Sequence, residues 1–248
     1  MTGPMKRVDL TDHEKALREA LPRPARPKKA ATLILWQGPR NNPRILMGQR
    51  AGRHDFMPDI YVFPGGRVDR GDSYVGFEGD LTQRTETVLE AANTPRQARA
   101  IALAAIRETW EETGLMLGKA KQMARNPRHE SWQAFYDAGM TPDISGIEVI
   151  GRAKTPPHRH KRFDTWFFSK EANSEKLNDV SDSRELLNVG WFTLEQITDL
   201  PLHAATKTML QVLSGFLQQT HPPARITYLR KQGRGFISDP FPNNRAAD

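Results

Sequence analysis

The 248-residue sequence combines 38% hydrophobic with 26% charged residues and contains no cysteine. This composition is typical of a globular protein, and the lack of cysteine excludes disulfides, thiolate zinc sites and cysteine nucleophiles. Because no apolar run is long enough to cross a bilayer and the N-terminus lacks an apolar leader, we expect a cytoplasmic protein without membrane contact.

The net charge of +7 is concentrated at the two ends of the chain. Residues 1–29 hold eight Lys and Arg against four Asp and Glu, and residues 222–248 hold five against two. The body between these ends is therefore neutral. We expect a basic N-terminal arm and linker over 1–29, one domain over 30–221, and a basic C-terminal extension over 222–248. Basic tails are usually solvated surface, so nucleic acid is an unlikely partner, although an RNA-processing enzyme stays an alternative.

The first half of the chain predicts a small set of strands. The apolar run 31–37 and the run 45–50 flank the turn sequence GPRNNPR, which favours a hairpin. A third strand over 59–66 is expected to end at Pro64 and the two glycines that follow it. Residues 67–93 are polar and irregular in pattern, so we expect no regular element there.

The strongest helix prediction covers TPRQARAIALAAIRETWEETG, with Thr94 as the N-cap, Pro95 at the first position and Gly114 as the stop. Further elements are expected as a helix near 129–138, strands near 147–154, 163–169 and 188–193, a helix over 203–218, and a last strand over 226–230 before a loose tail. Strands and helices alternate without a regular βαβ period, which predicts an α+β or α-β-α sandwich around a mixed sheet. The apolar face of helix 203–218 suits either packing or a homodimer surface.

Three glutamates at the end of the main helix raise an electrostatic problem. Glu108, Glu111 and Glu112 are three and four positions apart, so they share one face and repel one another. They also lie at the negative end of the helix dipole. Arg107 can offset part of this charge by pairing with Glu111. Oxygen ligands without His or Cys suit hard cations such as Mg²⁺ or Mn²⁺, and the glycines of FPGG allow a backbone carbonyl to approach as a further ligand.

FPGG (63–66) followed by AAIRETWEETGL (104–115) resembles the sequence signature of the Nudix hydrolase family. The resemblance implies a loop–helix–loop on a mixed sheet flanked by helices. It implies Mg²⁺ or Mn²⁺ bound by the Gly65 carbonyl, Glu108, Glu111 and Glu112, with Arg107 holding a glutamate in place. The implied reaction is hydrolysis of a diphosphate linked to another moiety. Glu108 is the first candidate for proton transfer.

The sequence departs from the family pattern in two respects. Gly66 and Arg107 are 41 positions apart, 27 more than in the standard motif, so we expect an insertion between the FPGG turn and the helix. The family's earlier glutamate, eight positions before the arginine, falls on Arg99. Glu90 or Glu86 from the insertion are candidates to replace it.

The long insertion and the flanking segments YVFPGGRVD and RFDTWFF resemble the family branch that includes coenzyme A diphosphatases. This resemblance implies coenzyme A or acyl-coenzyme A as substrate, with Arg50 and Arg53 in substrate binding. Arg162, in a basic loop before a strand, is a further candidate for phosphate contact, although a solvated loop explains it equally well.

Glu185 is the candidate for a later catalytic glutamate, with Asp182 as its competitor. The alternatives in substrate are ADP-ribose, NADH and dinucleoside polyphosphates. A non-catalytic Nudix-fold module that binds nucleotides is the alternative in function.

Overall fold

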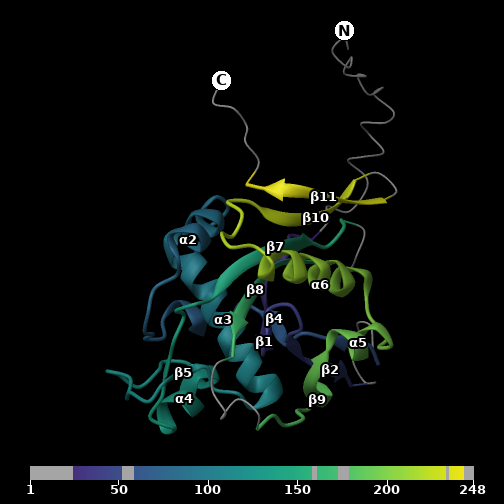
Figure 1. Cartoon of the computed structure of the whole chain (residues 1–248). Coiled ribbons are helices and arrows are strands. Elements are labelled where there is room, and N and C mark those ends of the chain that lie inside the picture. The colour runs from purple at the N-terminus through teal and green to yellow at the C-terminus, as the bar shows by residue number, and fades with distance from the viewer. Residues whose placement is uncertain (1–24, 52–58, 158–160, 173–178, 233–234, 243–248) are drawn as a thin grey trace, which may run out of the picture.

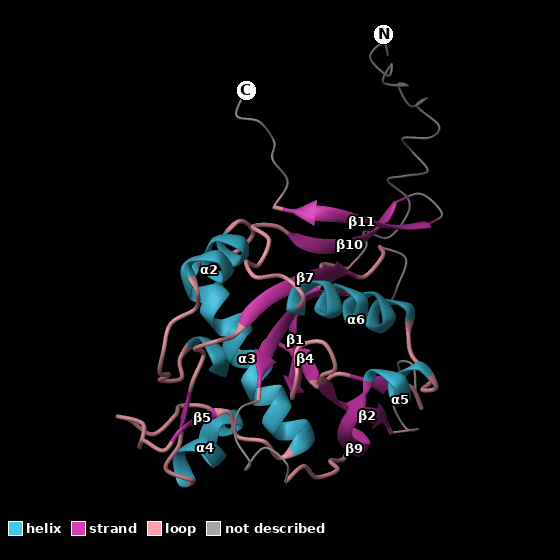
Figure 2. Ribbon diagram, viewed as in Figure 1, coloured by secondary structure: helices cyan, strands magenta, loops and turns pink. Residues whose placement is uncertain are grey.

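A mixed sheet with helices on both faces forms the core of the protein (Figures 1 and 2). The computed structural model describes residues 25–51, 59–157, 161–172, 179–232 and 235–242. In these residues the main sheet has nine strands in the order β11-β10-β7-β8-β1-β2-β3, with β4 paired to β1 and β9 paired to β2. The strands are β1 (Lys28–Gln37), β2 (Arg44–Arg50), β3 (Tyr61–Val62), β4 (Gly65–Arg67), β7 (Glu148–Lys154), β8 (Phe163–Glu171), β9 (Leu186–Thr193), β10 (Ile226–Gln232) and β11 (Gly235–Phe241).

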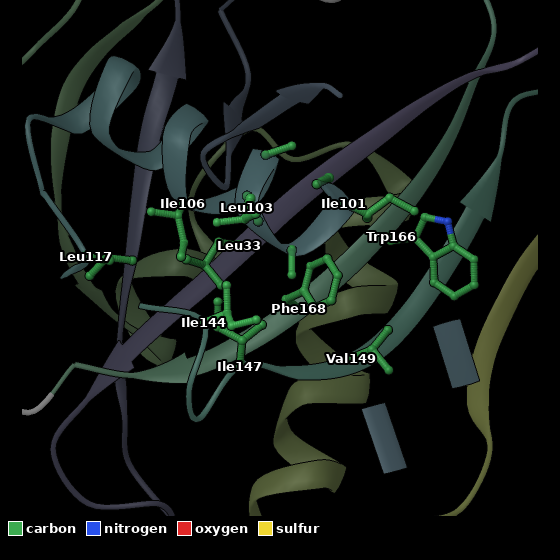
Figure 3. Packing of buried hydrophobic residues seen from close by; sticks show 14 of the residues in the cluster. Leu33, Ile101, Leu103, Ile106, Leu117, Ile144, Ile147, Val149, Trp166 and Phe168 are labelled. Carbon is green, nitrogen blue, oxygen red and sulfur yellow. The ribbon is translucent and has the colours of Figure 1, made fainter. Parts of the chain in front are cut away.

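Helix α3 (Pro95–Thr113) covers one face of the sheet and α6 (Ala204–Leu217) covers the other. The alternation of strand β1 explains this arrangement, because successive side chains point to opposite faces. Leu33 and Leu35 pack with α3, whereas Ile34 and Trp36 pack with α6. Figure 3 shows Leu33 and Phe168 of the sheet beside residues of α3 such as Ile101. The predicted α-β-α sandwich around a mixed sheet is therefore confirmed.

Most predicted elements are present with small shifts at their ends. The β1–β2 pair is antiparallel, and the α6 face that was open to two interpretations packs on the sheet through Met209, Leu213 and Leu217. The short helices are α4 (Gln133–Asp137), preceded by η2 (Glu130–Trp132), and α5 (Leu194–Thr198). A small pair of strands, β5 (Gly118–Lys119) and β6 (Thr141–Pro142), lies outside the main sheet. In the described part of the chain, no helix has the length and apolarity of a membrane span.

Three expectations about local structure were wrong. Gly65 and Gly66 do not end a strand but begin β4, which pairs with residues 30–32 of β1. The segment 67–93 contains the single turn η1 (Gly71–Ser73) and helix α2 (Gln83–Glu90). Thr82 caps α2, and the apolar residues Val88 and Leu89 of this helix are buried in the core. Two apolar residues among polar ones are too short a pattern to predict a helix from the sequence. In the part of the tail that the structure describes, residues 235–241 form β11, which pairs antiparallel with β10.

The C-terminal hairpin is attached to the sheet by a buried arginine. Arg152 of β7 donates two hydrogen bonds of 2.7 Å to the carboxylate of Asp164. Its guanidinium also lies 4.5 Å from the ring centroid of Trp166, 5.0 Å from that of Tyr228 and 4.8 Å from that of Phe241. Because cation–π contacts gain strength away from water, this cluster stabilises the hairpin against β7 and β8. Part of the predicted extension 222–248 thus belongs to the main sheet.

Candidate active site

Helix α3 brings the predicted carboxylates to the glycine turn. Its start is fixed by a capping box, in which the Thr94 hydroxyl accepts from the Gln97 N–H and the Gln97 side chain accepts from the Thr94 N–H. Its end is fixed by Gly114, whose φ of 76° is the left-handed conformation that favours glycine. The predicted helix boundaries are therefore confirmed. Between them, a row of buried alanines and Ile101 lets the helix lie close to β1 and β4.

The three glutamates in the last turns of α3 differ in burial. Glu112 is 8% exposed, the Glu108 side chain is 14% exposed, and the Glu111 side chain is 35% exposed. The Gly65 N–H donates a hydrogen bond of 2.8 Å to Oε2 of Glu112. Glu108 lies against the other glycine, since a Cβ on Gly66 would be 2.5 Å from its Cδ and 2.7 Å from its Oε1. The structure thus brings the FPGG turn and the helix end together, although 41 positions separate Gly66 from Arg107.

Arg107 is the centre of the hydrogen-bond network around these glutamates. Its side chain is 2% exposed, and all five guanidinium donors are used. Nη1 donates to Oε1 of Glu108 and to Oε2 of Glu111, both at 2.8 Å. The expected pairing of Arg107 with Glu111 is therefore present. Nη2 also donates to the carbonyl oxygen of Arg67, which fastens the residue after the glycines to the helix.

The remaining edge of Arg107 is paired with Asp72, a residue that the sequence analysis missed. Nε donates to Oδ1 at 2.8 Å and Nη2 donates to Oδ2 at 3.0 Å. Neither of the two candidates for a supporting carboxylate, Glu90, which is exposed on α2, or Glu86, is among the hydrogen-bond partners of Arg107. The GDS sequence has no periodic pattern, and only its position soon after FPGG distinguishes Asp72 from other loop carboxylates.

Burial and mutual repulsion raise the pKa values of the glutamates. Burial raises the pKa of Glu108 to about 7, although Arg107 opposes the shift and Glu111 adds to it. Burial also raises the pKa of Glu111, and raises that of Glu112 well above its usual value despite the Gly65 N–H. For Arg107, burial acts to lower the pKa, but the hydrogen bond to Asp72 and the charge of Glu108 raise it, so the guanidinium stays charged.

The chemistry of this site fits a hard divalent cation. Three carboxylates from one helix end supply only oxygen, and burial raises the pKa of each above its usual value, so a bound cation would favour their charged forms. In the described residues no three acidic or histidine side chains converge as a preformed ligand set. Glu108 and Glu111 are instead turned to Arg107, and Glu112 to the Gly65 N–H.

Arg50 and Glu185 lie at the edge of the glutamate cluster. Arg50 ends β2 and pairs with Leu186 at the start of β9, so it is next to Glu185 across the sheet. The charges of both residues act on Glu112, Arg50 lowering its pKa and Glu185 raising it. The competitor Asp182 is occupied elsewhere, because its Oδ1 accepts a hydrogen bond of 2.9 Å from the Val189 N–H.

Another predicted substrate contact, Arg162, lies away from this cluster. Arg162 donates to the carbonyl oxygens of Thr155 and Ala25, and its own carbonyl pairs with Lys28. Gly65 pairs with Thr32, four residues further along β1, which corresponds to roughly 13 Å of strand. Arg162 therefore fastens the chain at the far end of β1. Arg53 lies outside the described residues.

The structure is an α-β-α sandwich that carries a glutamate-rich helix end against a glycine turn. Comparison with known families identifies the class of protein: residues 90–213, half of the chain, match the family model of the NUDIX domain. The chain belongs to the Nudix hydrolase family, whose members generally use divalent metal ions.

Individual relatives agree with this assignment. The Caenorhabditis elegans protein named "Putative nudix hydrolase 7" is 27% identical over 182 residues, which are 69% of this chain and 53% of the relative. This chain thus spans about half the length of that relative. The crystal structure of a NUDIX hydrolase from Alicyclobacillus acidocaldarius has a TM-score of 0.55 and 25% identity, and the match covers 78% of this chain and 93% of the other.

Proposed function

We propose that the protein is a metal-dependent hydrolase of a diphosphate linkage in a nucleoside diphosphate derivative, with coenzyme A or an acyl-coenzyme A as the favoured substrate. The observation that carries the proposal is the packing of Glu112 against Gly65 and of Glu108 against Gly66, with Glu111 hydrogen-bonded to the same Arg107 nitrogen as Glu108. A protein that only binds nucleotides does not need three mutually repelling carboxylates, whereas a diphosphate hydrolase does.

Each residue of the cluster has a role in this reaction. Glu108, Glu111, Glu112 and the Gly65 carbonyl would hold Mg²⁺ or Mn²⁺. When bound, the cation neutralises charge on the phosphate oxygens and acidifies the attacking water. The water oxygen bonds to one phosphorus while the bridging P–O bond breaks, so that each product ends in a phosphate. Glu108 and Glu185 are the two candidates to accept the proton of the water, and the network of Arg107 supports the former.

Coenzyme A is favoured because of the branch resemblance and the position of Arg50. The substrate carries a diphosphate and a separate 3′-phosphate, so it needs a cationic contact beyond the divalent ion. Arg50 is close enough to act on Glu112 and lies beside Glu185 at the strand ends. A guanidinium in that position suits a phosphate oxygen.

A substrate panel tests the proposal. The full-length protein is incubated with coenzyme A, acetyl-coenzyme A, ADP-ribose, NADH and a dinucleoside polyphosphate, each with Mg²⁺, with Mn²⁺ and with EDTA. We expect release of 3′,5′-ADP from the coenzyme A compounds in the presence of either cation and none in EDTA. Release of AMP from ADP-ribose or NADH at a higher kcat/KM would reassign the substrate within the same reaction class.

Glu111→Gln is the matched control, because Glu111 is the most exposed of the three glutamates and its amide keeps the shape of the side chain. We expect kcat to fall roughly 10²- to 10³-fold, as for the loss of one group that stabilises transition-state charge. Undiminished turnover in this variant would refute the cation site. A wild-type protein that hydrolyses no diphosphate would support the binding module instead.

A further inference from the structure

A buried carboxylate in the segment between the glycine turn and α3 is paired with the arginine that holds two of the three glutamates. Asp72 is fully buried and accepts four hydrogen bonds. Two come from Arg107, at 2.8 and 3.0 Å, one of 3.1 Å comes from the indole N–H of Trp132, and one of 2.7 Å comes from the Asp69 N–H. A buried charge that is paired and hydrogen-bonded in this way holds one geometry.

The orientation of the Arg107 guanidinium follows from this pairing. Asp72 forms a bidentate pair with the Nε and Nη2 atoms of Arg107, a strong form of arginine–carboxylate interaction. The glutamates therefore share the remaining nitrogen, Nη1, which reaches one oxygen of Glu108 and one oxygen of Glu111. Neither Glu108 nor Glu111 forms a bidentate ion pair with Arg107, which would neutralise its charge.

We infer that Asp72 is a positioning residue for the candidate metal site, and that it replaces, from the segment 67–93, the supporting glutamate that the family pattern places at Arg99. By neutralising Arg107 and fixing its edge, Asp72 keeps the charge of Glu108 and Glu111 available to a divalent cation. The inference rests on the proposed function only for the identity of the ligand. It assigns the segment between the glycines and α3 a part in cation binding.

Trp132 extends this support to a third region of the chain. The residue is fully buried at the end of η2, and its ring packs edge-on to Phe135 of α4 with centroids 5.2 Å apart. Its indole N–H donates to the same Oδ1 atom that accepts from Nε of Arg107. Trp132 thus limits the rotation of the Asp72 carboxylate without touching any of the three glutamates through a hydrogen bond in the described network.

The test measures Mn²⁺ binding in the absence of substrate, together with kcat and KM. Asp72→Asn keeps the size of the side chain but places an amide N–H₂ against donors. Glu90→Gln is the control, because it removes an exposed charge from the same segment. We expect Asp72→Asn to weaken Mn²⁺ binding roughly 10- to 100-fold, as for other groups that orient metal ligands, and Glu90→Gln to leave it unchanged.

A purely structural role for Asp72 would give a different pattern. The melting temperature of the metal-free protein would fall, while the rise in melting temperature on adding Mn²⁺ would stay that of the wild type. That result, or unchanged Mn²⁺ affinity in Asp72→Asn, would overturn the inference. We also expect kcat to fall at limiting Mn²⁺ and KM for the substrate to change little at saturating Mn²⁺.

If Asp72→Asn does not fold, Trp132→Phe carries the same test, because it removes the indole donor, together with some buried ring volume, and keeps the pair with Arg107. A several-fold loss of Mn²⁺ affinity is expected, and an affinity equal to that of the wild type would refute the positioning role. The outcome is separable from the proposed function. A wild-type protein that binds Mn²⁺ through Asp72-dependent carboxylates but hydrolyses no diphosphate would refute the function alone.

Discussion

Alanine substitutions at the two adjacent glycines are expected to separate stability from activity. A Cβ on Gly66 would lie 2.5 Å from Cδ of Glu108, whereas a favourable carbon–carbon contact needs about 3.5 Å. The carboxylate must therefore retreat by roughly 1 Å. Because it is the end of a flexible side chain, the free energy of unfolding should change by less than about 1 kcal/mol. A displacement of this size at a reacting group costs roughly 10²-fold in rate.

Gly65→Ala is the matched comparison. Its Cβ would lie 2.5 Å from the carbonyl oxygen of Ala31 and 2.6 Å from Cα of Thr32, which are main-chain atoms of β1 and cannot rotate away. We expect a loss of about 1–3 kcal/mol in the free energy of unfolding, as for other overpacked sites.

The assay for both variants is urea unfolding together with the Mg²⁺-dependent rate on the substrate found for the wild type. Full activity in Gly66→Ala would show that Glu108 does not need the space over this glycine. A loss of stability in Gly66→Ala equal to that in Gly65→Ala would show that the two contacts do not differ in kind.

Three further outcomes follow from the site. Glu185→Gln, at the second candidate for the proton acceptor, should lower kcat by about 10-fold or more, while Asp182→Asn should change mainly stability; equal effects on kcat would remove Glu185 as a candidate. The pKa of Glu108 is about 7 in the folded protein against 4.5 for a free side chain, so folding favours the protonated form. The contribution of Glu108 to the free energy of unfolding is therefore complete below pH 4.5 and is lost as the pH rises through 7. In EDTA the free energy of unfolding should fall by up to about 3 kcal/mol over this range, and a Glu108→Gln variant with the same slope would exclude Glu108 as its source. Arg162→Ala should leave KM unchanged and lower the melting temperature, since its guanidinium contacts backbone; a large rise in KM would return it to the substrate site.

The sequence was sufficient for elements that depend on local patterns. The boundaries of α3 follow from Thr94, Pro95 and Gly114, which act within one turn of the helix ends. The spacing of Glu108, Glu111 and Glu112 likewise places them on one face without knowledge of the rest of the chain. The approach of Gly65 and Gly66 to these glutamates was predicted from the family resemblance, without knowledge of the sheet that brings the two segments together.

The errors concern contacts that local patterns do not encode. Gly65 and Gly66 predict the end of a strand because glycine is rare in strands. In the structure, pairing with β1 places both residues in β4 despite the low strand preference of glycine. Strand β11 depends on its partner β10 in the same way. Asp72 could not be selected because 35 residues separate it from Arg107, and any of several carboxylates in the segment had the right charge. Burial, which only the fold supplies, distinguishes it from Glu90.

The charges of the site explain why an arginine and a fourth carboxylate belong to it. Glu108, Glu111 and Glu112 crowd the negative end of α3, and one nearby cation would reduce their repulsion. Arg107 is that cation, but alone it would also neutralise one of the three carboxylates of the proposed cation site. Asp72 accepts the strong edge of the guanidinium, so Arg107 orders the glutamates through single hydrogen bonds without neutralising them. Burial raises the pKa values of the three glutamates, with repulsion among them adding to the shift for Glu108 and Glu112, and a bound cation would oppose both effects.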